Sequence, residues 1–256
     1  MAVLEVDNLT VGYSTPVVQN VTFSVEKGQV VGLLGRNGSG KTTILRGLTG
    51  SARVSGGTVR VNGTDCLGLK ARPRAALMAL LSQRIELTEG LRAGEIICMG
   101  RCAYGGPFSG PTEQDVDLCR RAAEKLNISH LWDRDCGTLS EGQRQMVQLA
   151  RVTAQDAAVL LLDEPNSALD YQNSRLLFEQ VQKLTRERDK AALVVMHDPA
   201  LALRWCDRLL RLENGRLTGE LEPAFAQTGE AQSFLSALYP GIMVKQDGPN
   251  GIFYCI

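Results

Sequence analysis

Hydrophobic side chains alternate with polar ones along several short segments in the first part of the chain. A period of two is typical of strands that bury one face and expose the other to water. We therefore predict an antiparallel β-layer with strands at residues 4–6, 9–13, 21–25 and 58–61.

Other segments are apolar throughout, namely residues 30–34, 77–82, 158–162 and 191–196. Helical patterns with a period near 3.6 separate the later ones, over residues 142–153 and 173–188. Continuously apolar strands between helices indicate a parallel sheet that is covered on both faces. The predicted fold class is therefore α/β, with an antiparallel β-subdomain beside the parallel core.

The middle of the chain has a helical period from residue 91 to residue 132. One helix there places its apolar side chains on a single face, at Val116, Cys119, Ala122, Ala123 and Leu126. A run rich in glycine and proline, residues 105–111, interrupts the pattern with a turn. We expect an inserted helical subdomain over about residues 91–153.

The end of the chain begins with a predicted hairpin, residues 209–212 and 216–221, joined by Asn214-Gly215. Beyond Pro223 the pattern weakens to a short helix over 233–238 and a terminal strand pair, 242–245 and 252–255. We predict one main domain over residues 1–221 and a small extension over 222–256.

Composition narrows the class of protein. Lys and Arg together number 28, equal to Asp and Glu, so no excess basic charge favours a nucleic-acid partner. No apolar run approaches the roughly 18 residues that span a bilayer, and the start lacks a signal-peptide pattern. The seven cysteines form no C-x-x-C pair, so we expect reduced thiols in a cytoplasmic protein.

The apolar run 30–34 leads into Gly35-Arg36-Asn37-Gly38-Ser39-Gly40-Lys41-Thr42, which matches G-x-x-x-x-G-K-[ST]. Its glycines allow the backbone to wrap around an anion, and the following helix N-terminus adds partial positive charge. Lys41 would reach the β- and γ-phosphates of a nucleotide, and Thr42 would hold Mg²⁺. Kinases, GTPases and motor ATPases share this loop, so alone it does not select among them.

A second candidate is Asp163-Glu164, where the apolar run 158–162 ends. Carboxylates at the C-terminal end of a parallel strand face the crevice in which open α/β sheets bind ligands. Asp163 can hold Mg²⁺, and Glu164 can accept a hydrogen bond from an attacking water. Without the phosphate loop, surface charges that end a strand would be the preferred interpretation.

The segment Leu139-Ser140-Glu141-Gly142-Gln143 alone indicates a helix start, with a capping box between Ser140 and Gln143. With its neighbours, it makes residues 3–221 closely resemble the nucleotide-binding subunit of ATP-binding-cassette (ABC) transporters. The motifs occur in that family's order: Tyr13, Gly35 to Thr42, Gln83, Leu139 to Gln143, Val159 to Glu164, Ser167 to Asp170, and His197. Glu141 and Asn166 depart from the residues that are more usual there.

The resemblance implies a P-loop NTPase core of the ABC ATPase type and a role for each motif. Tyr13 would stack on adenine, and the phosphates would lie against Gly35, Asn37, Gly38, Ser39, Gly40, Lys41, Thr42 and Thr43. Thr42, Gln83 and Asp163 would hold Mg²⁺, whereas Glu164, His197, Gln83 and Lys41 would carry hydrolysis. Ser140, Gly142, Gln143 and Asp170 would contact the ATP of a second copy in a head-to-tail homodimer.

A narrower resemblance is to the cassettes of importers for iron-siderophores, haem and cobalamin. It rests on residues 96–101, Thr112-Glu113-Gln114-Asp115, residues 169–173 and the terminal strand pair. It implies an ATPase on the cytoplasmic face of the membrane, bound to transmembrane permease subunits and served indirectly by an extracytoplasmic substrate-binding protein, with no nucleic acid. The alternatives are the ATPase of another ABC transporter, an ABC ATPase that acts on ribosomes or DNA, and a P-loop small-molecule kinase.

Overall fold

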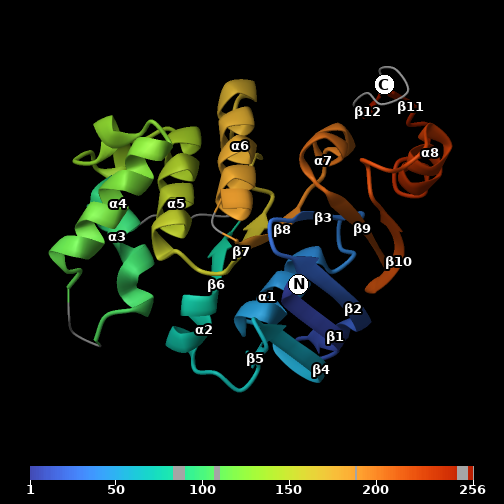
Figure 1. Ribbon diagram of the computed structural model, residues 1–256, viewed down its shortest axis with the longest axis horizontal. Helices are drawn as coiled ribbons and strands as arrows, with labels where there is room; N and C mark the ends of the chain where they lie inside the picture. The colour runs from blue at the N-terminus through green and yellow to red at the C-terminus, as the bar shows by residue number, and fades with distance from the viewer. Residues whose placement is uncertain (83–89, 107–109, 188, 247–252, 256) are drawn as a thin grey trace.

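The computed structural model describes residues 1–82, 90–106, 110–187, 189–246 and 253–255 (Figure 1). Its central sheet has the order β10-β9-β3-β8-β7-β6, in which β10 alone is antiparallel to its neighbour. These strands are β3 Val30–Leu34, β6 Met78–Leu81, β7 Val159–Asp163, β8 Ala191–Val195, β9 Arg208–Glu213 and β10 Arg216–Leu221. The predicted parallel sheet is thereby confirmed, with the predicted hairpin at its edge.

A second, antiparallel sheet has the order β2-β1-β4-β5. Its strands are β1 Ala2–Gly12, β2 Pro16–Glu26, β4 Arg53–Val61 and β5 Thr64–Asp65. The prediction of two separate strands within β1 was wrong. The register of β1 against β2 shifts between Val6 and Leu9, and Asn8 has a φ of 48°, so the alternation breaks although the strand continues.

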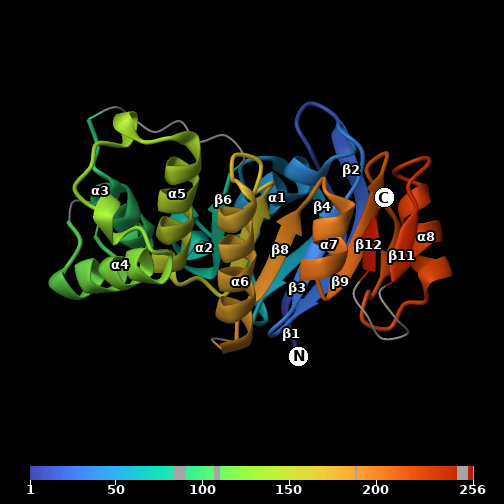
Figure 2. The same cartoon turned by 90° about the horizontal axis from the view of Figure 1, so that it is seen from above.

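Helices cover both faces of the central sheet, as Figures 1 and 2 show. They are α1 Lys41–Thr49, α2 Ala71–Leu77, α3 Ala93–Cys98, α4 Glu113–Lys125, α5 Glu141–Gln155, α6 Tyr171–Glu187, α7 Pro199–Trp205 and α8 Thr228–Ser236. Neither α2 nor α7 was predicted, and the helix of the extension, expected at residues 233–238, begins earlier, at Thr228. The terminal strand pair consists of β11 Val244–Gln246 and β12 Phe253–Cys255, which are antiparallel.

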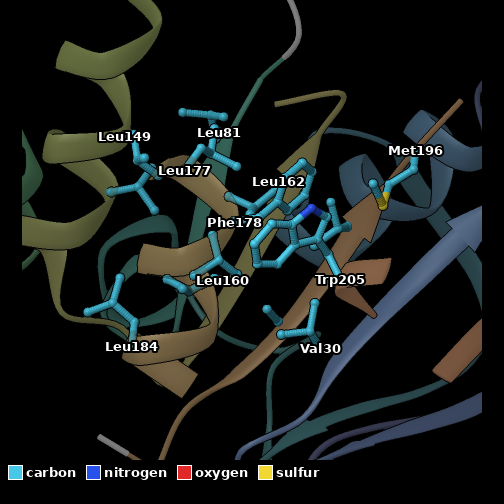
Figure 3. Close-up of a cluster of buried hydrophobic side chains, with 14 of the residues drawn as sticks. Val30, Leu81, Leu149, Leu160, Leu162, Leu177, Phe178, Leu184, Met196 and Trp205 are labelled. Carbon is cyan, nitrogen blue, oxygen red and sulfur yellow. The ribbon is translucent and has the colours of Figure 1, made fainter. Parts of the chain in front are cut away.

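The apolar core explains why the central strands are apolar at every position. Along β7, Leu160 and Leu162 point toward the helices on one face, where Phe178 of α6 stacks on Trp205 of α7 with 5.7 Å between ring centroids (Figure 3). Leu161, the residue between them, belongs to the cluster on the other face, which α1 and the antiparallel sheet cover. Both faces of the central strands β3, β7 and β8 are therefore buried, and only the ends of these strands remain available for polar groups.

Candidate functional site

The phosphate loop joins the end of β3 to the first residue of α1. Gly40 has a φ of 107°, a conformation that strongly favours glycine, and a Cβ there would lie 2.6 Å from Cγ2 of Val18. The tip of the β9–β10 hairpin supports the loop, because the N–H of Gly215 donates to the carbonyl of Ser39 at 3.1 Å. This support was not visible in the sequence, which indicated a hairpin turn at Gly215 but not the loop against which it packs.

Lys41 is buried beneath the loop, with 6% of its surface exposed. Its Nζ donates to the carbonyl oxygens of Gly35 at 2.7 Å and Arg36 at 3.2 Å. Burial lowers the pKa of Lys41, while the nearby carboxylates of Glu164 and Asp163 oppose that shift. The ammonium group is thus held inside the loop by acceptors that a phosphate oxygen can replace.

The loop has the donors that an anion requires. Among the described residues, no acceptor pairs with the backbone N–H groups of Gly38, Gly40 or the first three residues of α1, Lys41 to Thr43. The buried hydroxyl of Ser39 also lacks a hydrogen-bond partner within the described chain. Because buried donors are normally paired, this cluster fits a bound phosphate chain.

Asp163, at the end of β7, lies beside the start of α1. The hydroxyl of Thr42 donates to Oδ1 of Asp163 at 3.3 Å. Burial raises the pKa of Asp163, and the hydrogen bond from Thr42 works against that rise. A buried carboxylate and a hydroxyl side by side are oxygen ligands of the kind that Mg²⁺ prefers, so these residues fit the predicted ion.

Glu164 and His197 follow neighbouring parallel strands and meet beyond the strand ends. The Nε2 atom of His197 forms a short hydrogen bond with Oε1 of Glu164. The N–H of Glu164 donates to the carbonyl of Val195 at 3.1 Å, while its φ of 51° turns the chain sharply after β7. A left-handed conformation at a glutamate is uncommon and often accompanies a functional constraint.

A cleft of about 660 Å³ brings most of these groups together. Its lining is formed by residues 37–43, Glu164 and His197, with Val17 from the start of β2. The contribution of Val17 was not predicted, because an aliphatic side chain on a strand carries no local signal of a site. Gln83, predicted to bind Mg²⁺ or water, lies outside the described residues.

Tyr13 lies just beyond β1 and does not line this cleft. Half of its surface is exposed, and its hydroxyl accepts a hydrogen bond from Arg46 at 2.9 Å. The predicted stacking of Tyr13 on adenine stays a prediction, for which the exposed ring is available.

The predicted second contact region is at the N-terminus of α5. The N–H of Gln143 donates to the hydroxyl of Ser140 at 3.2 Å, and the N–H of Ser140 donates back to the Gln143 side chain at 3.1 Å. This is the predicted capping box. Ser140, Gly142, Gln143 and Asp170 line a hollow of about 730 Å³ that shares no lining residue with the phosphate cleft.

A glycine-rich loop that cradles phosphate, with two carboxylates and a histidine at the ends of neighbouring strands, defines a P-loop nucleotide hydrolase. The family described as ABC transporter matches residues 18–167. The chain therefore belongs to the ABC transporter family, as an ATP-binding cassette, and is an ATPase of that type.

Relatives include the hemin import ATP-binding protein HmuV of Bordetella avium, 37% identical over 216 residues, which are 81% of each chain. A probable iron chelatin transport ATP-binding protein of Helicobacter pylori is 34% identical over 239 residues, 93% of this chain and 92% of the relative. YvrA of Bacillus subtilis, an ABC transporter ATP-binding protein, is 33% identical over 249 residues. That match spans 96% of this chain but 56% of YvrA.

Solved structures agree with the fold. An ABC transporter assigned to the metal-chelate type, in an inward-facing conformation, matches with a TM-score of 0.81 and 26% identity over 100% of this chain and 96% of its own. The dimeric, post-hydrolysis cassette MJ0796, bound to ADP and phosphate, matches with a TM-score of 0.76 and 25% identity, covering 86% of this chain and 98% of its own. Within the described part of the present chain, no helix is both long and apolar enough to cross a membrane.

Proposed function

We propose that this chain is the ATP-hydrolysing subunit of a membrane importer for an iron-siderophore, haem or cobalamin. In this proposal it lies on the cytoplasmic face of the membrane, bound to permease subunits that receive their cargo from an extracytoplasmic substrate-binding protein. The names of the relatives from Bordetella and Helicobacter support iron or haem as cargo. The metal-chelate type of one structural neighbour supports the same class.

One observation carries the proposed chemistry: a single cleft is lined by Lys41, Thr42 and the hydrogen-bonded pair Glu164 and His197. Asp163 is joined to this cleft through its hydrogen bond from Thr42. The loop amides and Lys41 would bind and orient the phosphates of ATP. Thr42 and Asp163, with Gln83, would hold Mg²⁺, which supplies positive charge to the phosphate oxygens when bound.

Hydrolysis then requires an in-line attack of water on the γ-phosphorus. The new bond joins the water oxygen to phosphorus, and the bond from phosphorus to the oxygen that bridges the β-phosphate breaks. In this proposal, Glu164 would accept a hydrogen bond, and then a proton, from that water. His197, hydrogen-bonded to Glu164, would orient the carboxylate and contact the γ-phosphate.

A homodimer would complete each site. The unpaired N–H donors at the N-terminus of a helix favour an anion, so α5 is suited to contact a γ-phosphate held by another copy. The dimeric structure of the similar cassette MJ0796 supports this arrangement. Ser140, Gly142 and Gln143 would supply the contacts in trans, with Asp170 near the interface.

A pull-down of tagged Glu164→Gln protein with ATP and Mg²⁺ from solubilised membranes of the native host tests the transport role. We expect a polytopic membrane protein at equal stoichiometry. The same pull-down with the Lys41→Ala variant is the control for capture that depends on nucleotide. Recovery of ribosomes or DNA, or of no membrane partner, would contradict the importer. A substrate-binding protein linked to the captured permease can then be tested with iron chelates, haem and cobalamin.

A further inference from the structure

The extension beyond β10 makes a polar contact with the segment that carries His197. The hydroxyl of Tyr239 donates a hydrogen bond to the backbone carbonyl of His197 at 2.9 Å. Tyr239 comes just after α8 and is partly buried against the apolar core. The two residues lie 42 positions apart, so only the tertiary fold brings them together.

Several interactions fix the position of Tyr239. On its N-terminal side, Phe234, Leu235 and Leu238 are buried in the main core. Arg211 of β9 donates to the carbonyl of Phe234 at 3.1 Å, which ties α8 to the central sheet. The extension is therefore anchored to the core, and Tyr239 comes just after a firmly packed helix.

The segment that follows Tyr239 is also held in place. The side-chain amide of Gln232 donates to the carbonyl of Ile242 at 2.7 Å and accepts from the N–H of Val244 at 2.7 Å. These bonds tie the return strand β11 to α8. Figure 2 shows α8, β11 and β12 grouped beside α7, at the red end of the chain.

His197 occupies a short link between β8 and α7, and its position depends on what holds that link. Before it, the N–H of Met196 donates to the carbonyl of Leu33 at 3.2 Å. After it, Asp198 caps α7 by accepting from the N–H groups of Ala200 and Leu201. At His197 itself, Glu164 holds the ring and Tyr239 holds the main chain, while 41% of the side chain remains exposed.

We propose that Tyr239 is a positioning residue for ATP hydrolysis, because its hydroxyl fixes the main chain of His197 and so keeps the imidazole against Glu164. This inference rests on the proposed function, in which Glu164 and His197 act on the γ-phosphate and the attacking water. It makes the extension a part of the ATPase machinery, although α8, like His197 itself, lies outside the residues 18–167 that the family match covers.

The first test is Tyr239→Phe in the purified full chain, which removes only the hydroxyl. Loss of one positioning hydrogen bond should lower kcat about fivefold, with KM for ATP and the Kd of ATP unchanged. Thr228→Val is the matched control, because Thr228 contributes its hydroxyl to a contact with Gln246 inside the same extension, at 3.3 Å. The control should keep wild-type kcat. Wild-type kcat in Tyr239→Phe would overturn the proposal.

A double-mutant cycle separates positioning from a general structural effect. If Tyr239 acts through His197, then Tyr239→Phe should change kcat little when His197 is already Ala. The same fivefold loss in the His197→Ala background would overturn the proposal. Wild-type turnover in both His197→Ala and Glu164→Gln would instead refute the proposed active site. Loss of turnover in those two variants, with none in Tyr239→Phe, would refute only the role of Tyr239.

Discussion

The phosphate cleft and the hollow at the N-terminus of α5 differ in how their polar groups are held. In the cleft, Lys41 is buried and bound to loop carbonyls, and Glu164 is paired with His197. At α5, Ser140 and Gln143 form hydrogen bonds with each other, and Ser140 is exposed. The cleft is thus organised around charged groups within one chain, whereas the groups at α5 form a neutral cap that faces outward.

The two regions also differ in the charged groups that line them. The phosphate cleft contains a lysine and unpaired amide donors, which is what a triphosphate needs. The hollow at α5 contains neither lysine nor arginine among its described lining residues, and it includes the carboxylate of Asp170. It can contact a phosphate through helix amides but is poorly equipped to bind ATP alone. The difference supports the proposed homodimer, in which the cleft of one chain binds ATP and the hollow of its partner contributes contacts.

The largest expected effect separates binding from chemistry inside the cleft. Lys41→Ala should abolish ATP binding, because it removes the buried ammonium group that would contact the phosphates inside the loop. Glu164→Gln should leave ATP binding intact and lower turnover at least about a hundredfold, the scale for loss of a positioned acid–base group. Phosphate-release assays and a fluorescent ATP analogue measure the two quantities. Glu124→Gln, exposed on α4, is the control and should match the wild type. Wild-type turnover in Glu164→Gln would refute the assignment of the base.

The next effect tests whether the α5 hollow acts in trans. Gly142→Asp places a carboxylate at the N-terminus of α5, where an added Cβ would lie 3.2 Å from the carbonyl oxygen of Ala168. Negative charge there should repel a γ-phosphate. Turnover should fall at least about tenfold, while a single chain still binds ATP with nearly wild-type affinity. Sedimentation with ATP should show loss of the dimer, measured in the Glu164→Gln background.

Mixing the Gly142→Asp and Lys41→Ala proteins should restore part of the turnover, because a mixed dimer has one intact composite site. Gly142→Ala separates charge from size and should retain more activity than Gly142→Asp. If Gly142→Asp weakened ATP binding by a single chain as much as Lys41→Ala does, the two regions would belong to one site and the comparison would fail.

Local order along the chain explains which parts of the fold were predictable. The apolar run of β3 with the glycine loop, and the apolar run of β7 with its two carboxylates, each place strand and site residues within a few positions. The capping box at Ser140 is equally local. Signals of this kind can be recognised without tertiary information, so the observed bounds of these elements lie close to the predicted ones.

The remaining features depend on contacts between distant segments. The bond from Thr42 to Asp163 joins residues 121 positions apart, and the bond from Tyr239 to His197 crosses 42. The short helix α7 depends on its Asp198 cap and on packing of Trp205 against Phe178, which no periodicity revealed. In β1, a shift in register hid a single strand, because period-two analysis assumes an unbroken ladder.

The smallest expected effect concerns the frame around α5, by which we mean the hydrogen bonds of Arg101, Thr112 and Asp115 that join α4 to α5. Asp115 accepts from Nε of Arg101 at 2.7 Å and from the N–H and hydroxyl of Thr112, at 3.0 Å and 2.7 Å. Arg101 in turn donates to the carbonyl of Ala154 in α5 at 3.0 Å. The hydrogen bonds from Thr112, and then the Arg101 guanidinium, lower the pKa of Asp115 below its ordinary value of 3.8. The carboxylate thus links the start of α4 to α5.

Asp115→Asn should lower the free energy of unfolding by about 1 kcal/mol at pH 7, the scale for a helix cap. A lowered pKa in the folded state contributes stability above the unfolded pKa and loses it as the pH falls through the folded value. The gap between wild type and variant should therefore narrow below about pH 4 in urea unfolding, whereas Asp117→Asn, exposed on the same helix, should show no gap. ATP affinity should be unchanged, because the phosphate cleft contains neither Arg101 nor Asp115. A parallel loss of ATP affinity would show that the frame around α5 and the cleft are energetically coupled within one chain.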